Sequence, residues 1–116
     1  MDIRIKRIYL EAAKGDGYRL LVDRVWPRGM TKEHAHIDEW AKELAPSTEL
    51  RKWFDHDPAK YAEFKKRYAK ELHAVPEELE RLQTLARKQR VTLVYSAKDE
   101  EHNQAVVLRE VLLAKG

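Results

Sequence analysis

Two arginines flank a tryptophan in residues 23–29, which read DRVWPRG. Arg24 and Arg28 carry planar guanidinium groups that stay charged and suit a carboxylate or a phosphate. Trp26 lies between them and could stack on a base or another ring. The structural alternative is that Arg24 pairs with an acid such as Asp23, and that Trp26 fills the edge of the core. We expect Arg28 to be the better ligand-binding candidate and Trp26 to belong mainly to the core.

A second polar turn, residues 96–99 with the sequence SAKD, joins an apolar segment to a predicted helix. Backbone N–H groups at such a junction attract anions, and Lys98 would add a positive charge. The acidic run 99–101 complements the helix dipole and would repel a polyphosphate. Neither a phosphate-binding P-loop nor a dinucleotide fingerprint is present. We therefore expect a site for one anionic group, held by Lys98, Arg28 and Ser96.

Two of the five histidines, His56 and His102, are candidates for acid–base catalysis. Each has a carboxylate close by in the sequence, and a carboxylate can tune an imidazole for proton transfer. Asp55 and Asp99 could join them around a metal ion, but no spacing requires this and no metal is predicted. The other histidines are expected at the surface: His34, His36 and His73.

Ser96 and Ser47 are the serines that could act as nucleophiles. Neither lies in a Gly-x-Ser-x-Gly elbow, and Ser47 is explained more simply as a helix cap. Arg51 follows on that helix and could reach the strand-end site. Tyr95 could supply a phenol at the end of its strand, although a half-buried core tyrosine is the simpler interpretation. No residue pattern identifies a cofactor.

Three segments have the patterns of β-strands. Residues 3–9 alternate apolar and charged side chains, as in a half-buried strand. Residues 18–25 and 91–95 are more continuously apolar, as in strands covered on both faces. Asp23 interrupts the segment 18–25, and a buried unpaired carboxylate is costly, so we expect it to have a partner.

Helical patterns fill the rest of the chain. Apolar residues at i, i+3, i+4 and i+7 predict a helix over 37–44, and Ser47 or Thr48 could cap the next helix. Asp57-Pro58 predicts the start of a helix that runs to about Ala74, and Pro76 predicts the start of another. The last helix is expected to be capped by Asp99.

This order of elements predicts one α/β domain over residues 1–116, with three to four mostly parallel strands covered by about five helices. If residues 19–25 and 91–95 run parallel, their carboxyl ends share one edge of the sheet. Open α/β sheets bind ligands along that edge. The two polar turns would then face each other.

Composition limits the remaining possibilities. Charged residues make up 37% of the 116 residues and cysteine is absent, which excludes a disulfide-stapled scaffold and thiolate chemistry. No signal peptide or membrane-length apolar run is present, so we expect a cytoplasmic protein with no membrane partner. The net charge of +3 is uneven: residues 60–90 hold nine Lys and Arg against five Glu.

Three separated segments carry a family resemblance: residues 23–29, residues 45–54 (APSTELRKWF), and residues 95–99 (YSAKD) with His102-Asn103. Together they resemble the bacterial YeaO-like proteins of the family known as domain of unknown function 488. The resemblance runs essentially from end to end and implies a small Rossmann-like α/β fold with no agreed activity. Other branches of the family place a cysteine near the end of the last strand. Ser96 and Asn103 occupy that neighbourhood here, so cysteine chemistry does not carry over.

These observations leave three hypotheses. The leading one is a protein that binds a small anionic or nucleotide-like ligand at the carboxyl edge of the sheet. Such a protein could also be an enzyme. The second is a nucleic-acid-binding module that uses the basic helices of residues 60–90. The third is a structural or regulatory interaction protein whose strand-end charges form internal ion pairs. Oligomeric state does not follow from the sequence.

Overall fold

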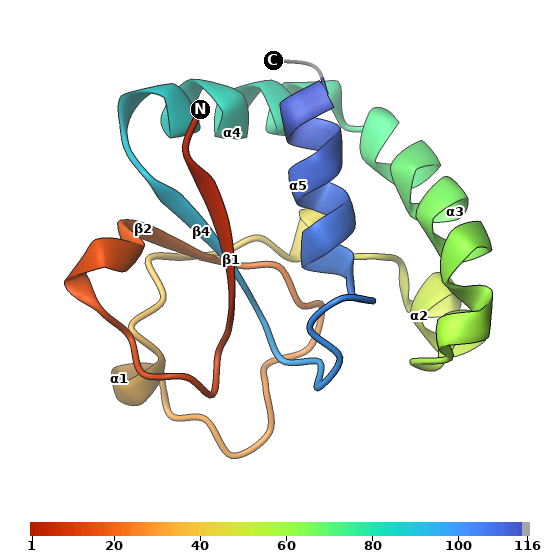
Figure 1. Cartoon of the computed structure of the whole chain (residues 1–116), viewed down its shortest axis with the longest axis horizontal. Helices are drawn as coiled ribbons and strands as arrows, with labels where there is room; N and C mark the ends of the chain where they lie inside the picture. The colour runs from red at the N-terminus through yellow and green to blue at the C-terminus, as the bar shows by residue number, and fades with distance from the viewer. Residues whose placement is uncertain (115–116) are drawn as a thin grey trace.

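The computed structural model describes residues 1–114, in which four strands form one parallel sheet (Figure 1). In chain order the strands are β1 (Ile3–Arg7), β2 (Tyr18–Leu21), β3 (Glu39–Trp40) and β4 (Val91–Tyr95). The spatial order is β1-β4-β2-β3, and every neighbouring pair is parallel. The predicted α/β class, with up to four parallel strands, is confirmed.

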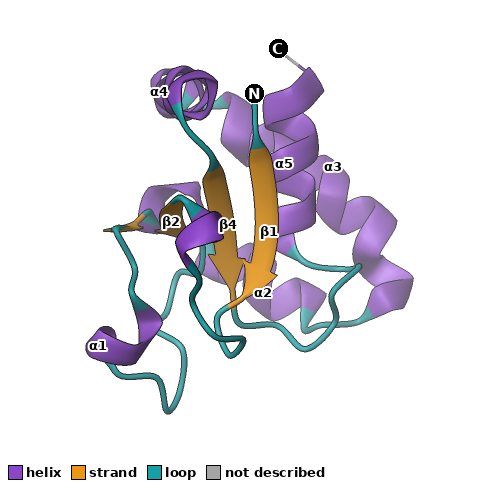
Figure 2. Cartoon of the chain, turned by 60° about the vertical axis from the view of Figure 1, so that its left-hand side comes forward, coloured by secondary structure: helices purple, strands orange, loops and turns teal. Residues whose placement is uncertain are grey.

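Five helices accompany the sheet in the described chain. They are α1 (Lys32–Ala35), α2 (Thr48–Phe54), α3 (Tyr61–His73), α4 (Pro76–Lys88) and α5 (Gln104–Ala114). Short 3-10 turns lie at Lys14–Asp16, Lys42–Leu44 and Pro58–Lys60. Figure 2 shows α3 and α5 on one side of the sheet and the short α1 on the other. One face is therefore covered by long helices and the other mainly by loop.

The two faces of the sheet carry separate cores because alternate strand residues point to opposite sides. On the larger core, Leu20 and Leu93 pack against the long helices. On the smaller core, Leu21 and Val94 pack against Ala35 of α1 and against the loop that follows β2. The loop that carries the DRVWPRG segment is thus part of the protein's second layer.

The helix predicted over residues 37–44 is wrong. That segment forms β3, which pairs with β2, followed by a 3-10 turn. Its apolar residues do not share one face: Ile37 and Trp40 pack on the smaller core, whereas Ala41 and Leu44 pack on the larger one. A spacing that looks helical in the sequence is therefore a strand that crosses from one core to the other.

The cap of the last helix is also corrected. Asp99 accepts hydrogen bonds from the backbone N–H groups of Glu101 (2.9 Å) and His102 (3.0 Å), but these close a turn before the helix. The helix α5 begins at Gln104, and its cap is the Asn103 side chain, which accepts from the N–H of Val106 at 3.1 Å. The acidic run 99–101 therefore precedes the helix instead of forming its first turn.

Other boundaries agree with the sequence patterns. The Ser47 hydroxyl accepts from the N–H of Leu50 at 3.1 Å, which confirms it as the cap of α2. Asp57 caps the turn that leads into α3, and α4 begins at Pro76 as predicted. β1 and β2 end earlier than predicted, at Arg7 and Leu21. Among residues 1–114, no helix is long and apolar enough to cross a membrane.

Candidate functional site

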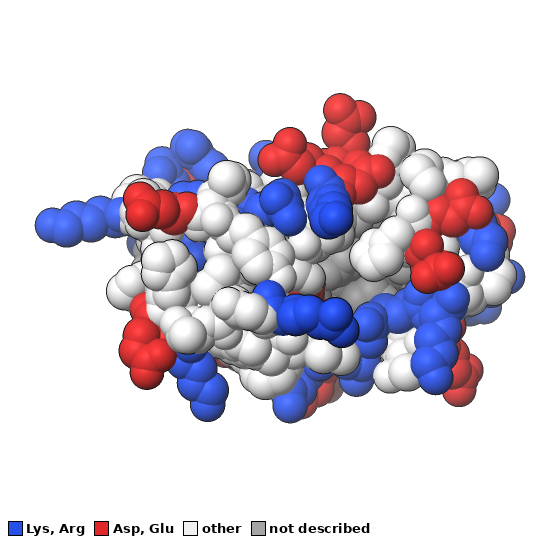
Figure 3. Space-filling view, turned by 90° about the horizontal axis from the view of Figure 1, so that it is seen from below, with Lys and Arg blue, Asp and Glu red and all other residues white. Residues whose placement is uncertain are grey.

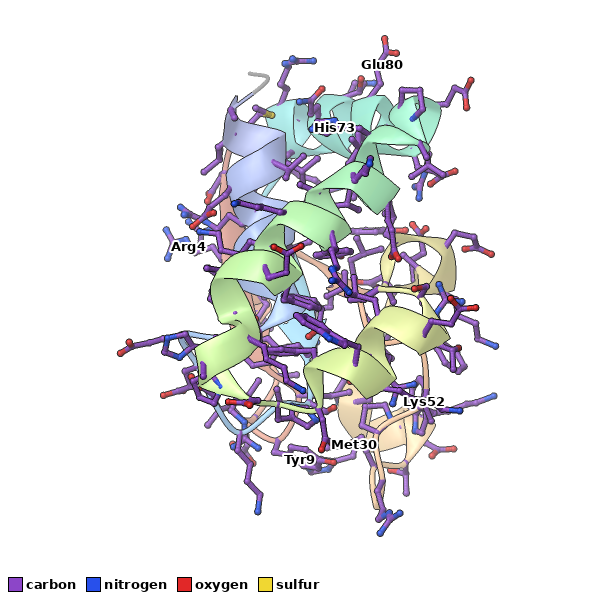
Figure 4. The ribbon with its side chains drawn as sticks, turned by 90° about the vertical axis from the view of Figure 1, so that its right-hand side faces the viewer. Arg4, Tyr9, Met30, Lys52, His73 and Glu80 are labelled. Carbon is purple, nitrogen blue, oxygen red and sulfur yellow. The ribbon has the colours of Figure 1, made fainter. Side chains whose placement is uncertain are left out.

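A cavity of about 560 Å³ lies at the carboxyl edge of the sheet, where the loops after β1, β2 and β4 meet α2 and the start of α5. Figure 3 shows this edge as a hollow with Lys and Arg side chains gathered along its lower border. Figure 4 places Tyr9 and Lys52, two lining residues, at the same lower end of the molecule. The parallel sheet thus brings together segments that are far apart in the sequence.

Most of the residues predicted for the site line this cavity. They are Arg24, Trp26, Arg28, Arg51, Ser96, His56 and His102. Two predicted residues lie elsewhere. Tyr95 is 2% exposed and packs in the larger core because it points to the helical face of β4. Lys98 is exposed but does not line the cavity.

The guanidinium group of Arg24 forms hydrogen bonds within the protein. Its Nε donates to the carbonyl of Pro46 at 2.8 Å and its Nη2 donates to the carbonyl of Ala45 at 3.2 Å. These bonds hold the loop before α2 against the end of β2. They satisfy two donors but leave the guanidinium charge uncompensated, because backbone carbonyls are neutral. Arg24 therefore both positions α2 and contributes positive charge to the cavity wall.

Arg28, Arg51 and Lys52 are exposed at the mouth of the cavity, and we call them the rim cations. Arg51 and Lys52 lie on α2, whose start is held by Glu71 of α3: the Glu71 carboxylate accepts from the N–H and hydroxyl of Ser47 at 2.9 and 2.7 Å. Within residues 1–114, no salt bridge involves Arg24 or any rim cation. The cavity wall therefore has an excess of positive charge.

The inner wall of the cavity consists of Asp23, Ser96 and Gln104. Asp23 is 7% exposed, and its carboxylate accepts from the Ser96 hydroxyl and from Nε2 of Gln104, each at 2.5 Å. Burial raises the pKa of Asp23 above its usual range, while these hydrogen bonds and the charge of Arg51 act in the opposite direction. The partner expected for Asp23 is thus a set of neutral donors instead of a cation.

Trp26 serves the core, as predicted, and also lines the cavity. Its ring packs edge-on against Trp40 at 5.3 Å between centroids, and its Nε1 donates to the carbonyl of Met30 at 2.6 Å. That bond uses the indole N–H, so only the ring surface remains for a ligand. Trp40 in turn donates to the backbone carbonyl of Asp23 at 2.7 Å. The two tryptophans therefore fix the strand end that carries Asp23 and Arg24.

His102 is oriented by Asp99. Its Nδ1 lies 2.9 Å from Oδ2 of Asp99, and its ring stands edge-on to Tyr61 at 5.0 Å between centroids. Hydrogen bonds from the backbone N–H of Glu101, and then from the backbone and side chain of His102, hold the pKa of Asp99 below its usual range. The bond at Nδ1 leaves Nε2 available to exchange a proton or to bind a ligand.

His56 follows the end of α2, where Asp55 and His56 both adopt left-handed backbone conformations with φ of 47° and 54°. This double turn bends the chain back toward the cavity. In the described chain, no hydrogen bond joins Ser96 to His56 or His102, since the Ser96 hydroxyl donates to Asp23. A serine–histidine pair of the kind that activates a nucleophile is therefore not assembled.

In the part of the chain that the structure describes, no group of three or more His, Cys, Asp or Glu side chains is placed to hold an ion. His34, His36 and His73 are exposed, and Figure 4 shows His73 beside α4, at the end of the molecule opposite to Tyr9. If a cofactor with a phosphate group binds in the cavity, the rim cations are the side chains that would bind its phosphate.

Sequence reasoning missed several lining residues. Lys52 is a cation next to Arg51 in the same predicted helix, so the sequence offers the same reason for placing it in the site. Asp23 interrupts an apolar segment, which indicates a buried carboxylate but not that it faces a cavity. Gln104, Phe54 and Phe64 gave no signal, because an amide near a helix start and core aromatics are common everywhere. Their roles follow from the packing of α2, α3 and α5 around the sheet edge.

Known proteins match the sequence of this chain over nearly its whole length. A family model described as "Inactive DUF488-N3 subclade" matches residues 2–115. The chain is 49% identical over 112 residues to the Escherichia coli (strain K12) protein named "Uncharacterized protein YeaO", covering 97% of each. It is 38% identical over 110 residues to the Mycobacterium bovis protein named "Uncharacterized protein Mb3100c", covering 95% of this chain and 92% of the relative.

A Mycobacterium tuberculosis protein named "Uncharacterized protein Rv3073c" matches with the same identity and coverage as the Mycobacterium bovis protein. No solved structure is a significant match. The family match and the identity to the Escherichia coli relative both extend from end to end, so they cover every segment that builds the cavity. The chain belongs to the DUF488 family, in its inactive DUF488-N3 subclade.

Proposed function

We propose that this protein binds a small molecule, through an anionic group, in the cavity at the carboxyl edge of its sheet. The observation that carries the proposal is the set of four basic side chains on the cavity wall, none of them in a salt bridge with a carboxylate of residues 1–114. Cations gathered in a cleft raise the local concentration of anions. The volume of about 560 Å³ lies within the usual range for small-molecule sites.

Binding without turnover is the form of this function that the site supports best. The Ser96 hydroxyl is bonded to Asp23 and not to a histidine, and the matching subclade is described as inactive. A single carboxylate or phosphate suits the rim cations, and a nucleoside monophosphate or a sugar phosphate would fit this description. The chain has no glycine-rich loop to enclose a polyphosphate.

The basic helices are a weaker candidate for ligand binding. Of the nine basic residues in 60–90, four are in salt bridges with carboxylates: Lys65, Arg67, Arg81 and Arg90. Their charges are locally compensated, unlike those of the cavity. A nucleic-acid interface on these helices, the second hypothesis, would show binding that weakens steeply with salt.

A thermal-shift experiment tests the proposal with nucleoside monophosphates, sugar phosphates and dicarboxylates. A ligand at 100 times its dissociation constant should stabilise the fold by about 2.7 kcal/mol. The double variant Arg28→Ala/Arg51→Ala should lose this shift, whereas the control Lys66→Ala/Lys70→Ala removes the same charge from α3 and should keep it. If no compound shifts the wild type more than the cavity variant, the proposal is wrong and the interaction-protein hypothesis takes its place.

A further inference from the structure

Among residues 1–114, no cation lies within salt-bridge distance of Asp23, which is 7% exposed and lines the cavity, and Arg51 acts on its charge only from a greater distance. The neighbours of Asp23 are a hydroxyl and an amide, both neutral, and none of the salt bridges formed by residues 1–114 includes it. A buried carboxylate without a counter-charge is costly. An ionised carboxylate has about four acceptor positions, and the two side-chain bonds leave capacity on the cavity side.

The cavity is therefore electrostatically bipolar. The three rim cations occupy its mouth beside one exposed carboxylate, Asp55, and the carboxylate of Asp23 occupies its inner wall. An anionic group is attracted to the mouth and repelled by the inner wall. Phe54 and Phe64, both buried, line the cavity with apolar surface that suits a carbon skeleton. A ligand that fills the whole cavity has to match both ends.

We propose that the ligand is amphoteric: besides its anionic group it carries an ammonium group that binds Asp23. The inference rests on the proposed anion site and names the second half of its ligand. Ammonium is preferred to hydroxyl because it supplies the missing positive charge as well as a hydrogen bond, and charge-assisted bonds are the stronger kind. The Ser96 and Gln104 side chains hold the carboxylate in place for that contact.

Calorimetric titration with three matched series of phosphates tests this inference on the wild-type protein. The series are alkyl, ω-hydroxyalkyl and ω-aminoalkyl phosphates with two to six carbons, so that one length spans the cavity. At that length the aminoalkyl phosphate should bind about tenfold more tightly than the alkyl phosphate. Asp23→Asn should remove this preference, and the affinity for the alkyl phosphate should rise, because the repulsion by the inner wall is lost.

The outcomes separate the two proposals. If alkyl phosphates bind but the amino group adds nothing at any length, or adds no more than a hydroxyl, the ammonium assignment is overturned and the anion site stands. If the Asp23→Asn variant keeps the preference for the amino group, Asp23 is not its partner. If no phosphate of any series binds, the anion site itself is wrong, and the inference falls with it.

Discussion

At the scale of a single residue, the buried carboxyl of Asp23 makes the stability of the fold depend on pH. Burial raises the pKa of its carboxyl, which means that the folded protein holds the proton more tightly than the unfolded chain does. The stability that this group contributes is then fully present below the unfolded pKa, about 3.9, and is lost as the pH rises through the folded pKa. A ligand ammonium group would reverse that loss.

Asp23→Asn should therefore gain stability relative to the wild type as the pH rises. The asparagine oxygen can still accept from Ser96, and the Gln104 amide can turn to face the new NH₂ group. Urea unfolding of both proteins between about pH 4 and pH 7 measures the difference in the free energy of unfolding. A difference that stays constant over this range would show that Asp23 does not titrate with a raised pKa.

The two arginines of the DRVWPRG segment should behave differently when truncated. Arg24→Ala removes the bonds to the Pro46 and Ala45 carbonyls and should lower the free energy of unfolding by about 1 to 2 kcal/mol. Arg28→Ala removes an exposed side chain and should stay within about 0.5 kcal/mol of wild type. Denaturant titration of both variants checks this, and equal losses would contradict the division into a positioning residue and a ligand-binding one.

At the scale of elements, tight turns set the register of the short strands. β2 begins directly after Gly17, which has φ of 67°. A Cβ at this position would lie 2.3 Å from the carbonyl oxygen of Arg90, the residue that precedes β4. The backbone there is packed so closely because the N–H of Tyr18 donates to the same carbonyl at 2.9 Å. Only glycine allows β2 and β4 to start side by side.

Gly17→Ala should therefore destabilise the protein by about 3 kcal/mol, the sum of backbone strain and a steric clash. Gly29 is a matched control, because its φ of 75° is equally left-handed but a Cβ there meets no atom within 4 Å. Gly29→Ala should cost only about 1 kcal/mol. Thermal and urea unfolding compare the two, and similar losses would show that the contact with Arg90 relaxes freely.

Elements with a single environment were predictable from the sequence, and the others were not. β4 was predicted to the residue because all of its side chains are buried. The start of α4 at Pro76 was predicted as well, and its apolar stripe faces one core. The helix prediction for residues 37–44 failed because the apolar residues of this segment divide between two cores, and hydrophobic periodicity does not reveal such a division. The prediction of the cap of α5 failed because Asp99 and Asn103 are equally good capping residues, and only the fold selects one.

The candidate site was predictable in its location more than in its roles. Parallel strands place residues 23–28 and 96 at one edge whatever the helices do, so the position of the cavity follows from the strand order. The role of Arg24 depends on two carbonyls that lie more than 20 residues away in the sequence. Tyr95 and Lys98 were wrongly placed in the site because the sequence does not show which way their side chains point. Side-chain direction at a strand end is decided by tertiary packing.

At the scale of the whole molecule, the net charge of +3 matters less than its arrangement. Cations on α3 and α4 are partly paired with neighbouring acids, while those at the sheet edge share a cavity and form no salt bridge with any acid of residues 1–114. Anions in solution should therefore concentrate at one end of the molecule and not along its helices. This distribution favours the proposed small-ligand site over a nucleic-acid surface on the helices.

A titration with ethyl phosphate, followed by ¹H–¹⁵N NMR, tests most directly whether the carboxyl edge of the sheet binds an anion. We expect the amide signals of four cavity residues to shift together and saturate, namely Arg28, Arg51, Ser96 and Gln104. The signals of Lys66 and Lys70 on α3 should stay fixed. The double variant Arg28→Ala/Arg51→Ala should abolish the shifts. Signals that move along α3 and α4 instead, or that do not move at all, would contradict an anion site at the carboxyl edge of the sheet.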